Sequence, residues 1–267
     1  MLFYDFAKSI ILEAGNNIRT WMNEDIDIET KSNPNDLVTN VDKETEQFLV
    51  QKIHDHDPSH LIVGEEGHGH DLTNVEGTIW VIDPIDGTLN FVHQKENFAI
   101  SVGIFVDGEM YAGFVYDVMK DRLYHAKSGD GAYVNDRKLP ILEDASVGRN
   151  LIAVNPNWLT KPKLSQLFHP IVNQSRSARA YGSAALEIVY VATGQLSLYM
   201  TPRLKPWDFA GGWIILKEVQ GKITNLNGDD ISILEPSSIL AGNHLAHHEA
   251  LSYFKANHQD VLDAIHS

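Results

Sequence analysis

The sequence predicts a fold of the α+β class with two halves, residues 1–140 and 141–267. In the first half, helical patterns precede a run of short apolar segments separated by turns, which is typical of an antiparallel meander. In the second half, short apolar segments alternate with helical patterns, which is typical of an α/β layer. The 267 residues fit one large domain or two intimate ones, and the chain contains no linker rich in serine and glycine. We therefore expect the halves to share an interface, with any cleft between them.

The first half opens with an amphipathic helical pattern. From Leu2 to Met22 the apolar residues recur at steps of three and four, which places them on one face of a helix. A break at residues 33–35 separates it from a second helical pattern over residues 42–51. Three charges of this second helix are interpreted as its solvated face: Lys43, Glu44 and Glu46. Short apolar runs bounded by turn residues then predict strands at residues 61–63, 79–82, 98–105, 110–116 and 122–125.

The second half alternates the two kinds of element. Strands are predicted at residues 151–154, 196–200 and 222–225. Helices are predicted at residues 183–193 and 207–219. The alternation indicates a layer of helices packed on a sheet.

The composition excludes several classes of protein. Acidic residues outnumber basic ones by 36 to 21, and a field of this sign repels the phosphate backbone of nucleic acids. Cysteine is absent, so disulfides and zinc fingers are excluded. The N-terminus lacks a basic start and no apolar run approaches the roughly 18 residues of a membrane span. We therefore expect a cytoplasmic protein without nucleic-acid or membrane partners.

The most informative stretch is Asp83-Pro84-Ile85-Asp86-Gly87-Thr88-Leu89-Asn90, which follows a predicted buried strand. Pro84 stiffens the turn, so the carboxylates of Asp83 and Asp86 can converge. Gly87 allows close approach of the backbone, and Thr88 can begin a helix whose free N–H groups would hold a phosphate. A capped turn with two solvated aspartates explains the same residues equally well.

Further acids stand at neighbouring positions. Glu65 and Glu66 end the strand 61–63, and Asp208 begins the helix 207–219, although an acid in a first helical turn is also common without any ligand. Buried carboxylates repel each other, and a divalent cation is the usual compensation. Ligands that are all oxygen favour Mg²⁺, Mn²⁺ or Ca²⁺. Because the chain lacks a G-x-x-x-x-G-K-[ST] loop, the residues indicate metal-assisted phosphoryl chemistry other than that of a P-loop kinase or ATPase.

In order and spacing, these segments resemble the inositol monophosphatase family of Mg²⁺-dependent, lithium-sensitive phosphatases. The resemblance rests on Gly64-Glu65-Glu66, on residues 80–91 and on Trp207-Asp208-Phe209-Ala210-Gly211-Gly212, with weaker support from residues 33–42, 129–133 and 182–185. It covers nearly the whole chain. It implies a five-layered α-β-α-β-α sandwich of the inositol monophosphatase and fructose-1,6-bisphosphatase type, commonly assembled as a homodimer.

The resemblance also implies a metal site with two to three Mg²⁺ ions, for which Mn²⁺ can substitute and at which Li⁺ inhibits. Glu65, Asp83 and the carbonyl of Ile85 would hold the first ion. Asp83, Asp86 and Asp208 would hold the second, and Glu65 would help to hold a looser third.

The implied reaction is in-line attack of a water molecule on phosphorus, without a covalent intermediate. Thr88 and Asp42 would orient or deprotonate the water, with help from Glu65. The implied substrate-binding residues are Asp86, Gly87, Thr88, Ser183, Ala184, Thr201 and Arg203. The expected activity is therefore hydrolysis of inositol monophosphate to inositol and phosphate.

Thr201 is the position at which the sequence departs from this family. Members that select inositol carry a glutamate seven residues before the Trp-Asp aspartate, where this chain has Thr201. Arg203 and Lys205 could attract a second phosphate, on a substrate such as NADP or fructose 1,6-bisphosphate, or could be solvated loop cations. Hydrolysis of NADP(H) at the 2′-phosphate or of fructose 1,6-bisphosphate is thus an alternative. A non-catalytic metal-binding regulatory protein is a third alternative, although the expected ligands are all present.

Overall fold

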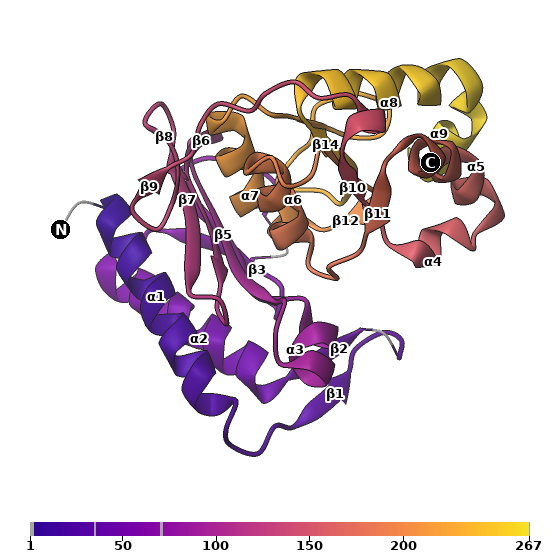
Figure 1. Cartoon of the computed structure of the whole chain (residues 1–267). Coiled ribbons are helices and arrows are strands. Elements are labelled where there is room, and N and C mark those ends of the chain that lie inside the picture. Colours follow the sequence, from indigo (N-terminus) through magenta and orange to yellow (C-terminus); the bar gives the residue numbers. More distant parts are fainter. Residues whose placement is uncertain (1–2, 35, 70–71, 267) are drawn as a thin grey trace.

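The computed structural model describes residues 3–34, 36–69 and 72–266, and in this part of the chain five layers follow one another in the order helix, sheet, helix, sheet, helix (Figure 1). Three clusters of buried apolar residues fill the spaces between the layers. The predicted sandwich is confirmed. Leu2 and Asn35, which the predicted first helix and the predicted break include, lie outside the described residues.

The larger sheet belongs to the first half of the chain. Its strand order is β3-β4-β5-β6-β7-β8-β9, in which β3 and β4 are parallel and the other neighbours antiparallel. The strands are β3 (Leu61–Gly64), β4 (Thr78–Asp86), β5 (Ala99–Val106), β6 (Glu109–Asp117), β7 (Arg122–Lys127), β8 (Gly131–Val134) and β9 (Arg137–Lys138). Helices α1 (Phe3–Trp21) and α2 (Asn40–His56) cover one face of this sheet (Figure 1).

Helices α6 (Ala184–Ala192) and α7 (Pro206–Glu218) form the middle layer against the other face of the larger sheet. Helix α7 lies unusually close to β5 and β6, because glycines stand where the backbones meet. A Cβ atom at Gly113 would lie 2.4 Å from the carbonyl oxygen of Gly211, and one at Gly103 would lie 2.7 Å from the Cβ of Ala210. These glycines therefore set how closely α7 can approach the sheet.

The smaller sheet has the order β11-β10-β12-β14-β13. Strand β10 is parallel to β11 and β12, whereas β14 is antiparallel to β12 and β13. Its strands are β10 (Leu151–Ala153), β11 (Ser177–Arg179), β12 (Leu198–Leu204), β13 (Lys222–Thr224) and β14 (Ser237–Gly242). Helices α5 (Pro162–Gln174), α8 (His244–Asn257) and α9 (Gln259–His266) form the last layer. Short elements complete the fold: the hairpin β1 (Ile28–Thr30) and β2 (Leu37–Thr39), α3 (Thr88–Gln94), the 3₁₀ turn Val147–Arg149 and α4 (Pro156–Leu159).

The predicted strands and helices are found, some longer, some shorter and some shifted by a few residues. Helix α2 begins at Asn40, because Thr39 and Asp42 form a capping box at its start. No sequence pattern predicted β1, β2, β8, β9, α4, α5, β11, β14, α8 or α9, whereas the helix expected to begin at Thr88 is α3. Helix α8 illustrates the reason: its buried residues Ala246, Ala250 and Phe254 form a narrow stripe among histidines. No helix within residues 3–34, 36–69 and 72–266 is long and apolar enough to span a bilayer.

Candidate metal centre

Three carboxylates converge where the two halves of the chain meet. Asp83 and Asp86 lie at the end of β4, and Asp208 lies in the first turn of α7. Each offers an oxygen atom, and these atoms lie within 4.8 Å of one another. The predicted convergence of Asp83, Asp86 and Asp208 is thus present in the structure.

An irregularity in β4 allows its two aspartates to act together. Residues three apart in a regular strand point to opposite faces of a sheet. Here the register against β5 shifts between Asp83 and Asp86, and the N–H of Ile85 folds back to donate to Asp83 Oδ1 at 3.0 Å. The Pro84 turn therefore directs both carboxylates to one point.

The group carries an electrostatic penalty. Burial, together with the charges of Glu65, Asp86 and Asp208, raises the pKa of Asp83 well above its usual range. Burial likewise raises the pKa of Asp86 to about 6, and burial and Asp86 raise that of Asp208. A hard divalent cation fits these all-oxygen donors and would relieve their repulsion.

Asp86 is held by the start of α6. The hydroxyl of Ser183 and the N–H groups of Ala184 and Ala185 donate to its carboxylate, the last at 2.7 Å. Ser183 and Ala184, which the family resemblance implies as substrate-binding residues, therefore contact Asp86 in the structure. Asp208 Oδ2 accepts the backbone N–H of Lys205 at 2.7 Å.

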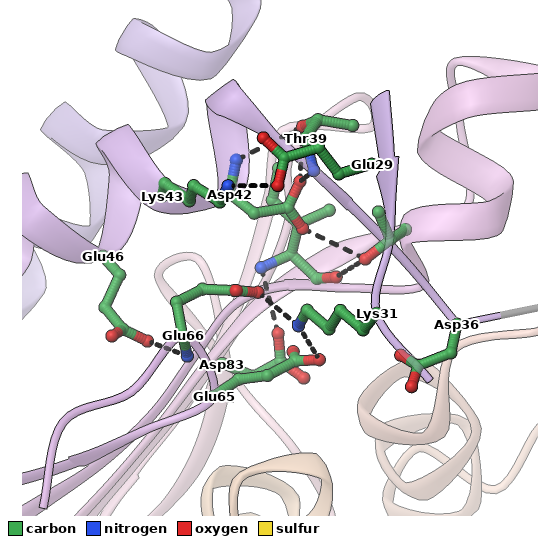
Figure 2. A network of polar contacts seen from close by, with 12 residues as sticks. Glu29, Lys31, Asp36, Thr39, Asp42, Lys43, Glu46, Glu65, Glu66 and Asp83 are labelled. Carbon is green, nitrogen blue, oxygen red and sulfur yellow. Dashed lines mark hydrogen bonds and ion pairs between the residues drawn. The ribbon is translucent and has the colours of Figure 1, made fainter. Parts of the chain in front are cut away.

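Thr88 and Asp42 are adjacent, although 46 positions separate them in sequence. Thr88 Oγ1 lies 3.0 Å from Asp42 Oδ1 and 3.2 Å from the carbonyl oxygen of Ile85. The other oxygen of Asp42 accepts the N–H of Thr39 at 2.9 Å (Figure 2). Burial raises the pKa of Asp42 to about 6. The pair has the geometry of a hydroxyl whose proton can pass to a carboxylate.

Glu65 stands at the edge of this group, and its carboxyl makes a side-chain hydrogen bond with that of Asp83. Figure 2 shows Lys31, from the segment that joins β1 to β2, between Glu65 and Glu66. Lys31 Nζ lies 2.9 Å from Glu65 Oε1 and 2.7 Å from Glu66 Oε1. Lys31 could not be predicted from the sequence, because nothing in its local pattern shows where the hairpin places it.

One of the three charges predicted on the solvated face of α2, that of Glu46, is not solvated. This residue was predicted on a solvated face with Lys43 and Glu44, but its side chain is buried. Its carboxylate accepts the N–H of Glu66 at 2.9 Å (Figure 2). It also lies 2.6 Å from Nδ1 of His68. The prediction was wrong because the partners come from a turn about 20 residues away in the sequence. Glu46 thus supports the turn that carries Glu65.

The residues expected to select the substrate lie in different surroundings. Thr201 is buried, with its hydroxyl directed to Tyr199. Arg203 lines a cavity of about 360 Å³ that also contains Asp230 and Glu235. Lys205 lines a separate cavity of about 210 Å³, with its ammonium group 5.8 Å from the centre of the Trp207 ring.

The cavity beside Lys205 lies between the two halves. One side is formed by Val63, Gly69 and Leu72, and the other by residues 205–207, Ile233, Leu234 and Pro236. Apart from Lys205 its side chains are apolar. Lys205 also donates its N–H to Asp208, so the cavity and the carboxylate group share one residue.

Comparison with known proteins gives one family. A family profile described as the inositol monophosphatase family matches residues 2–259. The inositol-1-monophosphatase of Bacillus subtilis (strain 168) is 49% identical over 245 residues, which are 91% of this chain and 92% of that protein.

Solved structures agree with the family match. The inositol monophosphate-bound structure of SaIMPase-II has a TM-score of 0.92 at 55% identity, covering 100% of this chain and 98% of that one. The 2′AMP-bound structure of SaIMPase-II has a TM-score of 0.93 at 56% identity, covering 100% and 99%. An IMPase/NADP phosphatase complexed with Mg²⁺ and phosphate has a TM-score of 0.88 at 29% identity, covering 95% of each chain.

Proposed function

The chain belongs to the inositol monophosphatase family of phosphoric monoester hydrolases, and from this premise we propose that it hydrolyses inositol monophosphate with Mg²⁺ held by Asp83, Asp86 and Asp208. The observation that carries the proposal is the convergence of these three carboxylates beside the Thr88–Asp42 pair. Bound Mg²⁺ supplies Lewis-acid chemistry, which polarises a phosphate ester and makes water more acidic.

The protein's own residues handle the proton. The hydroxyl of Thr88 donates to Asp42, so its oxygen can take a proton from the attacking water while its own proton passes to Asp42. Asp42, with its pKa raised to about 6, is ionised near pH 7 yet basic enough to take up that proton. Gly87, with a φ of 101°, turns the chain so that Thr88 begins α3 at this place, where both residues would contact the phosphate.

The finer features of the proposal follow the family resemblance. Two or three Mg²⁺ ions would bind, with Glu65 and the carbonyl of Ile85 as further ligands, Mn²⁺ as a substitute and Li⁺ as an inhibitor. Glu65 would then exchange its contact with Lys31 for one with the metal. A homodimer, a cytoplasmic location and the division near residue 140 stay predictions of the same kind.

The test is phosphate release from inositol 1-phosphate by the wild type and by Asp83→Asn, each in Mg²⁺ and in EDTA. Asp130→Asn is the matched control, because Asp130 is an exposed carboxylate. We expect turnover that needs Mg²⁺, persists in Asp130→Asn and is lost in Asp83→Asn. Mg²⁺ binding without hydrolysis of any phosphate ester would instead favour the non-catalytic alternative.

A second candidate is hydrolysis of a nucleotide 2′-phosphate, as in NADP(H). Two observations favour it: Thr201 is turned toward Tyr199 rather than offering an acid to a polyol, and the apolar cavity beside Lys205 and Trp207 would suit a base better than inositol hydroxyls. Comparing kcat/KM for inositol 1-phosphate, 2′-AMP, NADP and fructose 1,6-bisphosphate decides between the candidates. A large preference for inositol 1-phosphate would remove this second candidate.

A further inference from the structure

Glu187 is a buried carboxylate that the reaction described above does not use. It lies in α6 and is only 5% exposed, and burial raises its pKa to about 7. Its partners are three donors: the N–H of Tyr181 at 2.6 Å, the N–H of Gly182 and the hydroxyl of Tyr199. A buried acid with its acceptors committed to backbone N–H groups fixes the position of that backbone.

The turn that Glu187 holds is fixed from its other side by Asn90. Asn90 Nδ2 donates to the carbonyl oxygen of Tyr181 at 2.6 Å and to that of Asn97 at 2.8 Å. Gly182 has a φ of 74°, and a Cβ atom there would lie 2.9 Å from Asn90 Nδ2. Residues 181 and 182 are therefore clamped between Glu187 and Asn90.

This turn leads directly into the groups that hold Asp86. Ser183 follows Gly182, and its hydroxyl donates to Asp86, as does the N–H of Ala185. A shift of the turn would move these donors and the carboxylate together. Glu187 thus acts on Asp86 through one connected set of hydrogen bonds.

The same set extends to the position that departs from the family pattern. The hydroxyl of Tyr199, which donates to Glu187, accepts a hydrogen bond from Thr201. Thr201 is 4% exposed, so it faces this network rather than solvent. A residue expected to select the substrate is therefore linked through Tyr199 and Glu187 to a metal ligand.

We propose that Glu187 is a positioning residue that sets the Mg²⁺ affinity of the site by holding the 181–183 turn, and that Tyr199 and Thr201 act through it. The proposal rests on the proposed function in that it takes Asp86 as a metal ligand. Outer residues that orient metal ligands typically change metal affinity by about 10- to 100-fold when removed. A role in folding alone would lower stability without this change.

The experiment compares Glu187→Ala and Glu187→Gln with the same substitutions at Glu218. Glu218 is a matched control, because it accepts the N–H groups of Gly129 and Gly131 at 3.0 and 2.9 Å in another turn. It stands at the far end of α7, ten residues after Asp208 and so about 15 Å along the helix. The measurements are the Mg²⁺ concentration for half-maximal activity, kcat at saturating Mg²⁺, and the rise in Tm that Mg²⁺ produces.

We expect Glu187→Ala to raise the half-saturating Mg²⁺ concentration about tenfold or more and to shift the Mg²⁺-dependent rise in Tm to correspondingly higher Mg²⁺, with a smaller change in kcat. Glu187→Gln, which keeps one acceptor, should lie between Glu187→Ala and the wild type. Both Glu218 variants should lose stability and keep the wild-type Mg²⁺ response. If the Glu187 and Glu218 variants behave alike, the proposal is overturned. A wild type without any Mg²⁺ response would overturn the proposed function itself.

Tyr199→Phe and Thr201→Val test the extension. Each should raise the half-saturating Mg²⁺ concentration, by less than Glu187→Ala does. Tyr199→Phe should add little to Glu187→Ala in the double variant, because both act through one network. Fully additive effects in that double variant would show that Tyr199 does not act through Glu187. A Thr201→Val variant that changes only the KM for the phosphate ester would show that Thr201 acts on the substrate and not through Glu187.

Discussion

Asp86→Asn should stabilise the metal-free protein while removing its activity. The pKa of Asp86 is raised from 3.8 to about 6, chiefly by burial, so the ionised carboxylate opposes folding above that pH. A shift of about 2 units corresponds to about 3 kcal/mol. Asparagine carries no charge, and its oxygen can still accept from Ser183 and Ala185. At about 2 °C per kcal/mol for a protein of this size, Tm in EDTA at pH 8 should rise by about 6 °C.

The pH dependence has a definite sign. A carboxyl group with a raised pKa costs nothing below its unfolded value of 3.8 and its full penalty above about 6. The advantage of Asp86→Asn should therefore shrink to about 1.6 kcal/mol at pH 5. In excess Mg²⁺ the order should reverse, because only the wild type binds the ion well. A lower Tm for Asp86→Asn in EDTA at pH 8, or an equal gain at both pH values, would refute the reasoning.

Three further predictions follow. Gly87→Ala should lower the free energy of unfolding by about 1–3 kcal/mol, because φ is 101° and a Cβ would meet Gly182 and Ser183 at 3.2–3.3 Å. Gly129→Ala should lower it less in the same denaturation assay, because Gly129 has a φ of 85° but faces open space. kcat at saturating Mg²⁺ should fall as pH drops below about 6, because Asp42 must lose its proton to act as a base. A flat kcat profile from pH 5 to 8 would contradict that role. Glu46→Gln should destabilise the protein by about 1–3 kcal/mol, because it disturbs the buried contacts with the Glu66 N–H and with His68. Glu44→Gln, at an exposed position, should change Tm little. Equal Tm values for the two variants would be evidence against a role of Glu46 in supporting the 64–68 turn.

Much of the fold follows from local pattern. The apolar run at residues 79–82 and the alternating strands up to residue 125 predict the larger sheet, because such runs need burial on one or both faces. Short strands such as β1 and β11, both of three residues, carry too little pattern for this reasoning. Their positions are set by the pairing with distant strands.

The site divides in the same way. Asp83 and Asp86 could be predicted because a rigid turn at a strand end carries both of them within four residues. Asp208 could be placed with them through the family resemblance, since its own first-turn position is ordinary. Glu46, Lys31 and Glu187 could not be predicted, because each acquires its role from a partner that only the tertiary fold brings near, such as the Glu66 carboxylate that meets Lys31.

We expect the protein to fold before a cation binds, although its site gathers like charges. Bringing Asp208 to Asp83 and Asp86 brings like charges together, and the Asp86 penalty alone is about 3 kcal/mol near neutral pH. Helix α7 opposes this with buried residues such as Phe209, Ile214 and Ile215, each fully buried and each contributing about 1.5–3 kcal/mol as an upper value. The close contact at Gly113 lets that burial occur against the sheet. We therefore expect the packing of α7 to offset the repulsion at its first turn, so that binding of a cation adds stability to a site that is already formed.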